Sequence, residues 1–374
     1  MVGCTVSGGG CSDGGDQAMR IRAGWTLVET MTTGEVTVVA RDNYPRGRTS
    51  FRRAVQDRIG AGQGPGAEAA QWLAGIVDRL RTDTEPVQAT HTLRSGLEVG
   101  ARAVPVVGPD GSLFGVHVWL GPAAIGPARP PLPAFGFVWD ASTRIADIPP
   151  VLAGMPRAKL TAPEMFRFIE PADGLSLIRA LLTPQPGASW EGAVTVIVDQ
   201  RRVPAHAVLV AGPVDGQWRG LLFEVTGAEN TSGQSLEAAA LEAIPRMTNV
   251  HVALVDVQKM RLLRWITDPM TDVIWKGEQD QRDAPHPEDV ERIFAKAAEM
   301  FAGTVDSAST DKIRLRRRGG GWVVVDGAAA IMRTTEPPLA IVQFHVVGYS
   351  DDPDPVPPAD TGHPGLPPPV ERSP

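Results

Sequence analysis

Cysteine is almost absent from this chain. Cys4 and Cys11 are the only two among 374 residues, and both lie in a Gly/Ser-rich stretch, residues 1–19. Their C-x6-C spacing, with no histidine or further cysteine nearby, differs from the spacings of zinc ligands. We therefore expect no structural role for the pair. We expect residues 1–19 to be a disordered leader, with Met19 as an equally good start of the protein.

Long apolar runs and an excess of basic residues are also lacking. No uninterrupted run reaches the roughly 18 residues of a membrane span, and the leader has neither the basic start nor the apolar stretch of a signal peptide. The 36 Lys and Arg against 43 Asp and Glu give a net charge of −7. That balance disfavours a broad surface for nucleic acid phosphates. We expect a cytoplasmic protein whose partners include neither a membrane nor a nucleic acid.

Apolar residues are nonetheless plentiful. Hydrophobic residues make up 43% and charged residues 21% of the chain, which suits packed cores. A chain of 374 residues commonly forms two or three domains. Three strand-length apolar runs that each end at glycine favour three domains, because they recur roughly 110 residues apart, the size of a small domain. These runs are residues 112–121, 218–227 and 338–348.

The predicted organisation follows from these three closing strands and from the Pro/Gly-rich stretches between them. The last residues are rich in Pro and Asp and poor in apolar side chains, which predicts disorder. The predicted segments are a leader 1–19, a first domain 20–121, a linker 122–133, a second domain 134–227, a helical connector 228–248, a third domain 249–348 and a disordered Pro-rich tail 349–374.

The first domain is predicted to begin with a β-hairpin and to continue with helices. Apolar spacing indicates helices over 51–59 and 67–80. The run Gly60–Gly66 between them follows a helix and lacks a Lys-Ser/Thr ending, so a flexible connector is favoured over a phosphate loop. Strands are expected at 24–30, 34–40, 97–107 and 113–120, with a Gly108–Gly111 turn between the last two.

The second and third domains share a Pro-x-Asp sequence at the start of a helix. Asp173 precedes apolar residues at helical spacing, and so does Asp289. A carboxylate suits a helix start because it faces the free N–H groups there, so both residues are expected to mark the fold and not to act as acids or bases. The predicted apolar faces are Leu175, Ile178, Leu181 and Leu182, and Val290, Ile293, Phe294, Ala297 and Phe301.

Two strands are expected after each helix, at 192–199 and 203–210 and at 312–317 and 321–326. Four arginines cluster in the third domain, Arg314, Arg316, Arg317 and Arg318. Arg314 and Arg316 alternate with apolar residues, which is typical of one solvated strand face. A phosphate-binding patch is the alternative.

Histidine and tryptophan are the remaining candidates for a site. The histidines are scattered and form no i, i+4 pair, so no metal site is expected. The nine Trp against two Tyr are expected to fill cores, with pocket walls as the alternative. The residues concerned are His91, His117, His206, His251, His286 and His345, and Trp25, Trp139, Trp190, Trp218, Trp265, Trp275 and Trp322.

The order of elements in residues 135–227 and 249–348 resembles PAS sensor domains. The run 313–325, a charged strand followed by a Gly turn and a Trp-bearing strand, is similar to the hairpin of that family. Residues 20–121 are more similar to a GAF domain, chiefly through residues 104–116. Together they resemble an actinobacterial GAF–PAS–PAS protein made only of sensor domains, which implies an α+β fold of three tandem domains, each an antiparallel sheet with flanking helices.

The resemblance implies a non-enzymatic sensor or scaffold in signal transduction. Its partner would be a protein that carries the effector function, and a small ligand could occupy a GAF or PAS pocket. Covalent flavin and bilin attachment in such domains use a cysteine within the domain, so no cofactor is expected here. No catalytic or metal-binding residues are predicted, and the cofactor-binding residues are unknown.

The alternative is an enzyme whose site is assembled from separated residues and leaves no sequence motif. The sequence contains no nucleotide-binding Gly box and no Gly-x-Ser-x-Gly elbow. Polar residues converging on a deep pocket would favour the enzyme, and an apolar pocket would favour the sensor. We also predict an amphipathic helix over 232–247 that packs on a sheet and couples the second and third domains.

Overall fold

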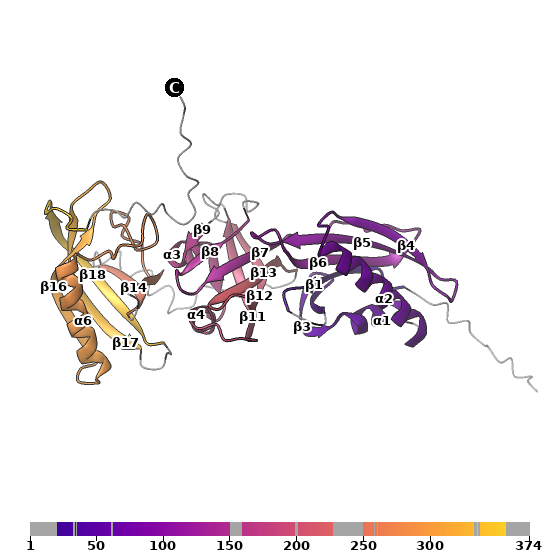
Figure 1. The fold of residues 1–374 in the computed structure, drawn as a ribbon, viewed down its shortest axis with the longest axis horizontal. Helices are drawn as coiled ribbons and strands as arrows, with labels where there is room; N and C mark the ends of the chain where they lie inside the picture. The colour runs from indigo at the N-terminus through magenta and orange to yellow at the C-terminus, as the bar shows by residue number, and fades with distance from the viewer. Residues whose placement is uncertain are drawn as a thin grey trace, which may run out of the picture.

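The computed structural model describes residues 21–356 apart from 33, 35, 61–62, 150–158, 199–200, 227–249, 258, 260, 333–334 and 336. Within these residues the chain forms three antiparallel sheets and five helices, so the predicted α+β fold is confirmed. The three sheets follow one another along the long axis of the molecule (Figure 1). The predicted helix over 232–247 lies outside the described residues.

The first domain carries a six-stranded sheet with two helices on one face. Val116, Val118 and Leu120 of the sheet pack against Leu73 and Val77 of the second helix. The predicted hairpin and the predicted pair of late strands are both present. The elements are β1 Gly24–Glu29, β2 Thr37–Arg41, β3 Tyr44–Ser50, α1 Phe51–Ile59, α2 Gln63–Leu80, β4 Val87–Thr92, β5 Glu98–Val107 and β6 Leu113–Pro122.

The Gly-rich run in this domain is not the expected seven-residue connector. Gly60 ends α1 in the left-handed conformation with φ 63°, and its N–H donates to the carbonyl of Gln56. Helix α2 then begins at Gln63, four residues earlier than the apolar spacing indicated. Pro65 is compatible with this start, because a first-turn residue needs no N–H donor. The helix therefore absorbs most of the run.

The second domain carries a seven-stranded sheet in the order β10-β11-β12-β13-β7-β8-β9. Two short helices cover its core, where Trp139 and Trp218 are almost fully buried and donate hydrogen bonds to the carbonyls of Leu181 and Ala180. The elements are β7 Ala134–Asp140, β8 Ile145–Asp147, β9 Lys159–Thr161, α3 Ala162–Phe168, β10 Ile169–Pro171, α4 Gly174–Leu182, β11 Ser189–Val198, β12 Arg201–Ala211 and β13 Gln217–Glu224.

The third domain carries a five-stranded sheet in the order β15-β14-β18-β17-β16, with one long helix on a face. The elements are β14 Val250–Asp256, β15 Arg261–Trp265, α6 Pro287–Phe301, β16 Ser307–Arg316, β17 Trp322–Met332 and β18 Leu339–Ser350. The closing strands predicted from the sequence are β6, β13 and β18. Each pairs with the first strand of its own domain, so each lies at the centre of its sheet.

The apolar face predicted for the third-domain helix is partly wrong. Ala297 and Met300 of α6 are buried, whereas Phe294 and Phe301 are 42% and 41% exposed. Met300 was not among the predicted residues. The helix therefore packs on the sheet through Ala297 and Met300, which are three positions apart and lie on the same face. The two phenylalanines lie away from that face.

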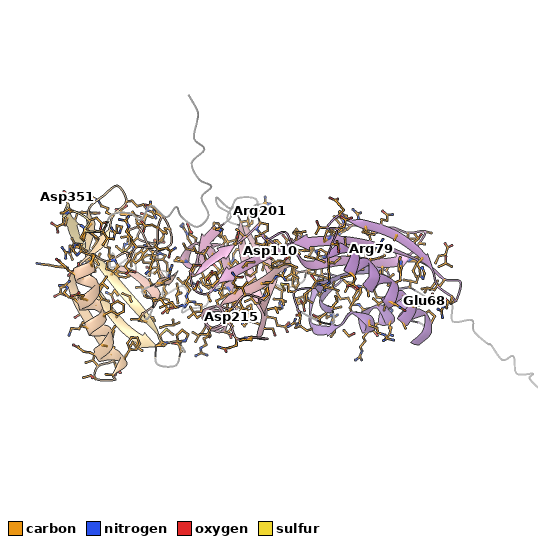
Figure 2. All side chains as sticks on the ribbon, in the orientation of Figure 1. Glu68, Arg79, Asp110, Arg201, Asp215 and Asp351 are labelled. Carbon is orange, nitrogen blue, oxygen red and sulfur yellow. The ribbon has the colours of Figure 1, made fainter. Side chains whose placement is uncertain are left out.

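The first and second domains pack on each other through a shared apolar core. This shared core includes Leu27, Val39 and Phe114 of the first domain and Leu221 and Phe223 of the second. It lies on the face of the first sheet opposite α1 and α2, since neighbouring side chains of β6 point to opposite faces. Asp110, labelled in Figure 2, lies where the two sheets meet. The first two domains therefore share buried apolar surface.

Candidate functional site

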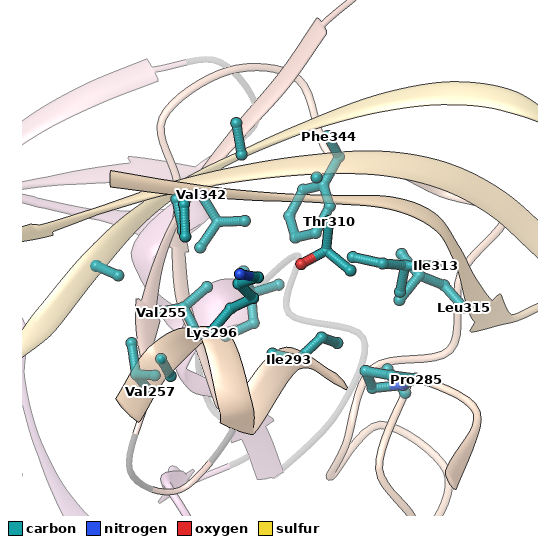
Figure 3. Close-up of a pocket in the computed structure, with 18 of the residues that line it drawn as sticks. Val255, Val257, Pro285, Ile293, Lys296, Thr310, Ile313, Leu315, Val342 and Phe344 are labelled. Carbon is teal, nitrogen blue, oxygen red and sulfur yellow. The ribbon is translucent and has the colours of Figure 1, made fainter. Parts of the chain in front are cut away.

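A cavity of about 100 Å³ lies between α6 and the third sheet. Its walls come from every strand of that sheet and from the helix (Figure 3). Val255, Val342 and Leu315 line it on the sheet side, and Ile293 and Ala297 line it on the helix side. The cavity is a candidate binding site because it is concave, largely enclosed and apolar.

Small side chains on the sheet create this space. Gly327 and Ala329 of β17 and Ala340 of β18 face α6, where larger residues would fill the gap between the sheet and the helix. Ala308 of β16 pairs with Ala329 and extends the same wall. A protein core is normally packed without voids larger than a water molecule, so a run of small residues beneath a helix leaves a defined cavity.

The polar atoms that line the cavity are mainly hydrogen-bond donors. Trp275 is 9% exposed, and its Nε1 has no hydrogen-bond partner in the described part of the chain. The hydroxyl of Thr310 points into the cavity in Figure 3, and the side chain of Lys296 extends across it. Nζ of Lys296 lies 3.0 Å from a carboxylate oxygen of Glu299. An unpaired buried donor costs about 1–3 kcal/mol, so the indole N–H is suited to a ligand acceptor.

The remaining cation of the lining, Lys276, is also paired. Its Nζ lies 2.5 Å from Oδ1 of Asp283. Among the described residues that line the cavity there is no Asp, Glu, His or Cys. General acid–base and nucleophilic chemistry most often uses such groups within reach of the substrate, and the two lysines of the lining are held in ion pairs. The arrangement therefore suits binding.

The reverse face of the same sheet packs against the second domain. Leu254, Leu263 and Leu339 of the third domain belong to the apolar core that contains the second-domain residues Met165 and Phe166 of α3. Successive side chains of a strand point to opposite faces. Along β14, Val255 therefore faces the cavity, whereas Leu254 faces the second domain. One strand contacts both the candidate site and the neighbouring domain.

A buried ion pair reinforces this junction. Nη2 of Arg144 in the second domain lies 2.8 Å from Oδ2 of Asp256 at the end of β14. Arg144 also donates to the carbonyls of Ala141 and Leu182. The second Asp256 oxygen, Oδ1, accepts a hydrogen bond from the backbone N–H of Lys259. Both charged groups are thus held in fixed positions between the two domains.

The two aspartates predicted at helix starts have different roles. Asp173 is the N-cap of α4, and its carboxylate accepts a hydrogen bond from the N–H of Ser176 at 2.9 Å, as expected of a helix start. The N-cap of α6 is His286, not Asp289. Asp289 accepts hydrogen bonds from the backbone N–H and the Nε of Arg314, at 2.9 and 3.0 Å. Its predicted place at a helix start is confirmed, because it lies in the first turn of α6, and it also joins α6 to β16.

The environment of Asp289 sets its protonation. Burial of the carboxyl would raise the pKa, but the hydrogen bonds from Arg314 and the charges of Arg314 and Arg292 outweigh this and hold the pKa of Asp289 below its usual range. Asp289 is therefore ionised in the folded protein near neutral pH and forms one half of a structural ion pair.

The arginine cluster is not a solvated strand face. Arg316 is 6% exposed and lies over the ring of Trp322, with its Cζ 5.2 Å from the ring centroid. Each of the four arginines pairs with an acid within the described chain. The pairs are Arg314 with Glu288, Asp289 and Asp352, Arg316 with Asp354, Arg317 with Asp351, and Arg318 with Glu278. These acids offset the positive charge that a phosphate patch would need.

The histidines form no metal-ligand cluster with other His, Cys, Asp or Glu within the described residues. His117 of β6 is 7% exposed, and burial lowers its pKa from 6.5 to about 4. Its Nε2 has no hydrogen-bond partner in the described structure. His117 is therefore neutral at physiological pH.

Some of the tryptophans fill cores and one lines the cavity, so both roles considered from the sequence occur. Trp139, Trp218 and Trp322 fill cores and are 2% exposed or less. Trp275 lines the cavity and contacts Trp265 edge-on, with ring centroids 5.4 Å apart. Sequence reasoning did not single out Lys296 or Thr310. The run of small residues Gly327–Ala330 was the available signal for a cavity under α6.

Fold and site together define a tandem of α+β domains with a small apolar cavity in the third. Residues 24–131 match the family description "Rv3651-like, N-terminal", and residues 237–337 match "Rv3651-like, C-terminal domain". The chain is therefore an Rv3651-like protein that carries both domains of the family. No curated protein gives a significant match to the chain.

A solved structure has the same fold as this chain. The crystal structure of an uncharacterized protein from Mycobacterium tuberculosis matches with a TM-score of 0.66 and 20% identity, over 87% of this chain and 96% of that one. The chain has this fold. An RNA-binding light-oxygen-voltage receptor matches at 14% identity and a TM-score of 0.21, over 58% of this chain and 96% of that one.

A chemoreceptor domain gives a similarly distant match. The ligand-binding domain of the Campylobacter jejuni chemoreceptor Tlp3, in complex with L-valine, matches at 8% identity and a TM-score of 0.17, over 54% of this chain and 66% of that one. TM-scores of 0.21 and 0.17 are far below those of two chains that share one fold throughout.

Among the described helices, none has the length and apolar character needed to cross a bilayer.

Proposed function

We propose that this protein is a non-enzymatic sensor and scaffold in signal transduction, with a GAF-like first domain and PAS-like second and third domains. In this proposal the third domain binds a small apolar ligand, and a protein partner supplies the effector function. The observation that carries the proposal is the cavity under α6, whose lining is apolar apart from Trp275, Thr310 and two lysines. The expected cytoplasmic location remains a prediction from composition.

The position of the cavity supports a sensing role. Val255 lines the cavity, whereas Leu254 and Asp256, its neighbours on β14, contact the second domain. A ligand that changes the packing around Val255 would act on the strand that carries both interdomain contacts. A ligand shifts a conformational equilibrium only through a difference in its affinity for the two states. Contact with a strand at a domain junction provides a physical basis for such a difference.

Hydrogen–deuterium exchange with 1-hexanol as a probe tests this proposal. Hexanol should slow exchange in β14 and β18, which line the cavity, and in residues 140–147 of the second domain, which include Arg144. Ala329→Leu is the matched control, because the larger side chain fills the cavity from β17. The variant should fold and lose both effects. Slower exchange that is the same in the wild type and in Ala329→Leu would contradict the proposal.

The alternative of an enzyme with a motif-less site finds less support in this cavity. Its described lining has no Asp, Glu, His or Cys, and its two lysines are held in ion pairs with Asp283 and Glu299. We therefore propose that the protein is not an enzyme.

A further inference from the structure

We propose that the ligand of the third-domain cavity is a small monocarboxylate with a short apolar tail. This inference rests on the ligand-binding role proposed above. The tail would occupy the apolar interior between α6 and the sheet, and the carboxylate would be bound by donors of the lining, with Lys296 at the mouth.

The size and surface of the cavity define the tail. A cavity of about 100 Å³ is smaller than the apolar cavity of about 150 Å³ that binds benzene, so it limits the buried part of the tail to a short alkyl chain. The interior is formed by aliphatic and aromatic side chains such as Leu262, Met300 and Phe344. An apolar tail would gain free energy by leaving water for this surface, whereas a second charged group would not find a partner there.

The polar atoms define the head group. Trp275 Nε1 is a donor only, and it is buried without a partner in the described structure. Thr310 contributes a hydroxyl that has no hydrogen bond within the described residues and points into the cavity (Figure 3). Lys276 and Lys296 are cations, and the described lining has no acid. A lining of donors and cations is complementary to an anionic acceptor.

Lys296 is available to such an anion. Its side chain is 47% exposed, and its present partner, Glu299, is 48% exposed on the same face of α6. Exposed pairs of this kind contribute about 0–1 kcal/mol, so a carboxylate can share or replace Glu299 at little cost. The aliphatic stem of lysine can lie along apolar surface while its ammonium group stays at the water boundary. Lys296 can therefore hold the carboxylate at the mouth while the tail is buried.

Isothermal titration of the full chain with sodium hexanoate and with 1-hexanol separates the head group from the tail. Hexanoate should bind about fivefold more tightly than hexanol, because its charge is recognised as well as its tail. Lys296→Gln should remove that preference and leave hexanol affinity unchanged. Glu299→Gln is the matched variant on the same helix face, and it should strengthen hexanoate binding because it frees Lys296.

The outcomes distinguish this inference from the proposed function. Equal affinity for hexanoate and hexanol, or unchanged hexanoate affinity in Lys296→Gln, overturns the monocarboxylate proposal and leaves the apolar ligand site intact. If neither probe binds at millimolar concentration, or if Ala329→Leu binds both as well as the wild type does, the proposed function fails with it. Circular dichroism of each variant confirms that it is folded before titration.

Discussion

Arg144 and Asp256 form an ion pair across the junction of the second and third domains, with their side chains 3% and 1% exposed. The two residues are 112 positions apart in the chain. Both side chains are removed from solvent, so their charges are compensated within the protein and not by water. Their pairing makes the junction sensitive to the loss of either partner.

Asp256→Asn should destabilise the protein strongly. The substitution leaves the Arg144 guanidinium buried without its counter-charge, which costs about 3–5 kcal/mol. Urea unfolding followed by circular dichroism measures the loss. The double variant Arg144→Met/Asp256→Leu should recover much of it, because no unpaired buried charge remains. If Asp256→Asn is as stable as the wild type, the pair does not hold the junction together.

Asp289→Asn should cost more stability than Asp173→Asn. Asp173 makes one cap hydrogen bond in an exposed position, worth about 1 kcal/mol. Asp289 is 3% exposed and holds Arg314, so its loss should cost about 2–3 kcal/mol. Thermal unfolding of both variants at pH 7 gives the comparison, and equal melting temperatures would contradict it.

The Asp289 contribution should also depend on pH. Its pKa is lowered on folding, so the unfolded chain binds the proton more readily than the folded protein does. The stabilisation is therefore complete above the ordinary pKa of Asp and is lost as the pH falls through the lower folded pKa. The stability difference between the wild type and Asp289→Asn should narrow as the pH is lowered below about 4.

His117 should make the protein less stable in mild acid. The folded pKa is about 4 and the unfolded value is near 6.5, so between these values only the unfolded chain binds the proton. Stability should fall by up to about 3 kcal/mol as the pH drops from 6.5 to 4, and then level off for this group. His117→Phe should remove this part of the pH dependence. Unfolding curves of both proteins at pH 7, 5.5 and 4 test it, and parallel curves would refute it.

Gly136→Ala should disturb the contact between the first and second domains. A Cβ at Gly136 of β7 would lie 2.7 Å from Cγ of Phe114, which belongs to the shared core. Relief of that overlap should cost about 1–3 kcal/mol. Gly75→Ala in α2 is the control, because no atom lies within 4 Å of the added carbon. It should stabilise the helix by about 0.5–1 kcal/mol. Loss of stability in both variants alike would argue against a specific clash.

The central part of each sheet could be predicted from the sequence because it depends on local patterns. Continuous apolar runs such as residues 113–120 are typical of buried strands, and their repetition predicted three domains, each with its own sheet. Asp173 was correctly placed at a helix start because capping involves residues three positions apart. The prediction of a connector over Gly60–Gly66 was wrong because helix α2 tolerates glycines in its first turn when the later turns are well packed.

The site and the domain junctions depend on residues that only the folded chain brings together. Asp289 meets Arg314 across 25 positions, which no local spacing predicts. Arg316 alternates with apolar residues as an exposed side chain would, but the acids of other segments and the ring of Trp322 bury it. The cavity requires small residues on β16, β17 and β18 to fall beneath one helix, and this depends on strand register.

The apolar core shared by the first two domains determines how the protein can be dissected. A protease that cuts the chain between residues 122 and 133 would break one peptide bond, but Phe114 would stay packed among Leu221, Phe223 and their neighbours. The two pieces should therefore co-migrate on a sizing column and separate only in denaturant. Either piece expressed alone would present that apolar surface to water and should be prone to self-association.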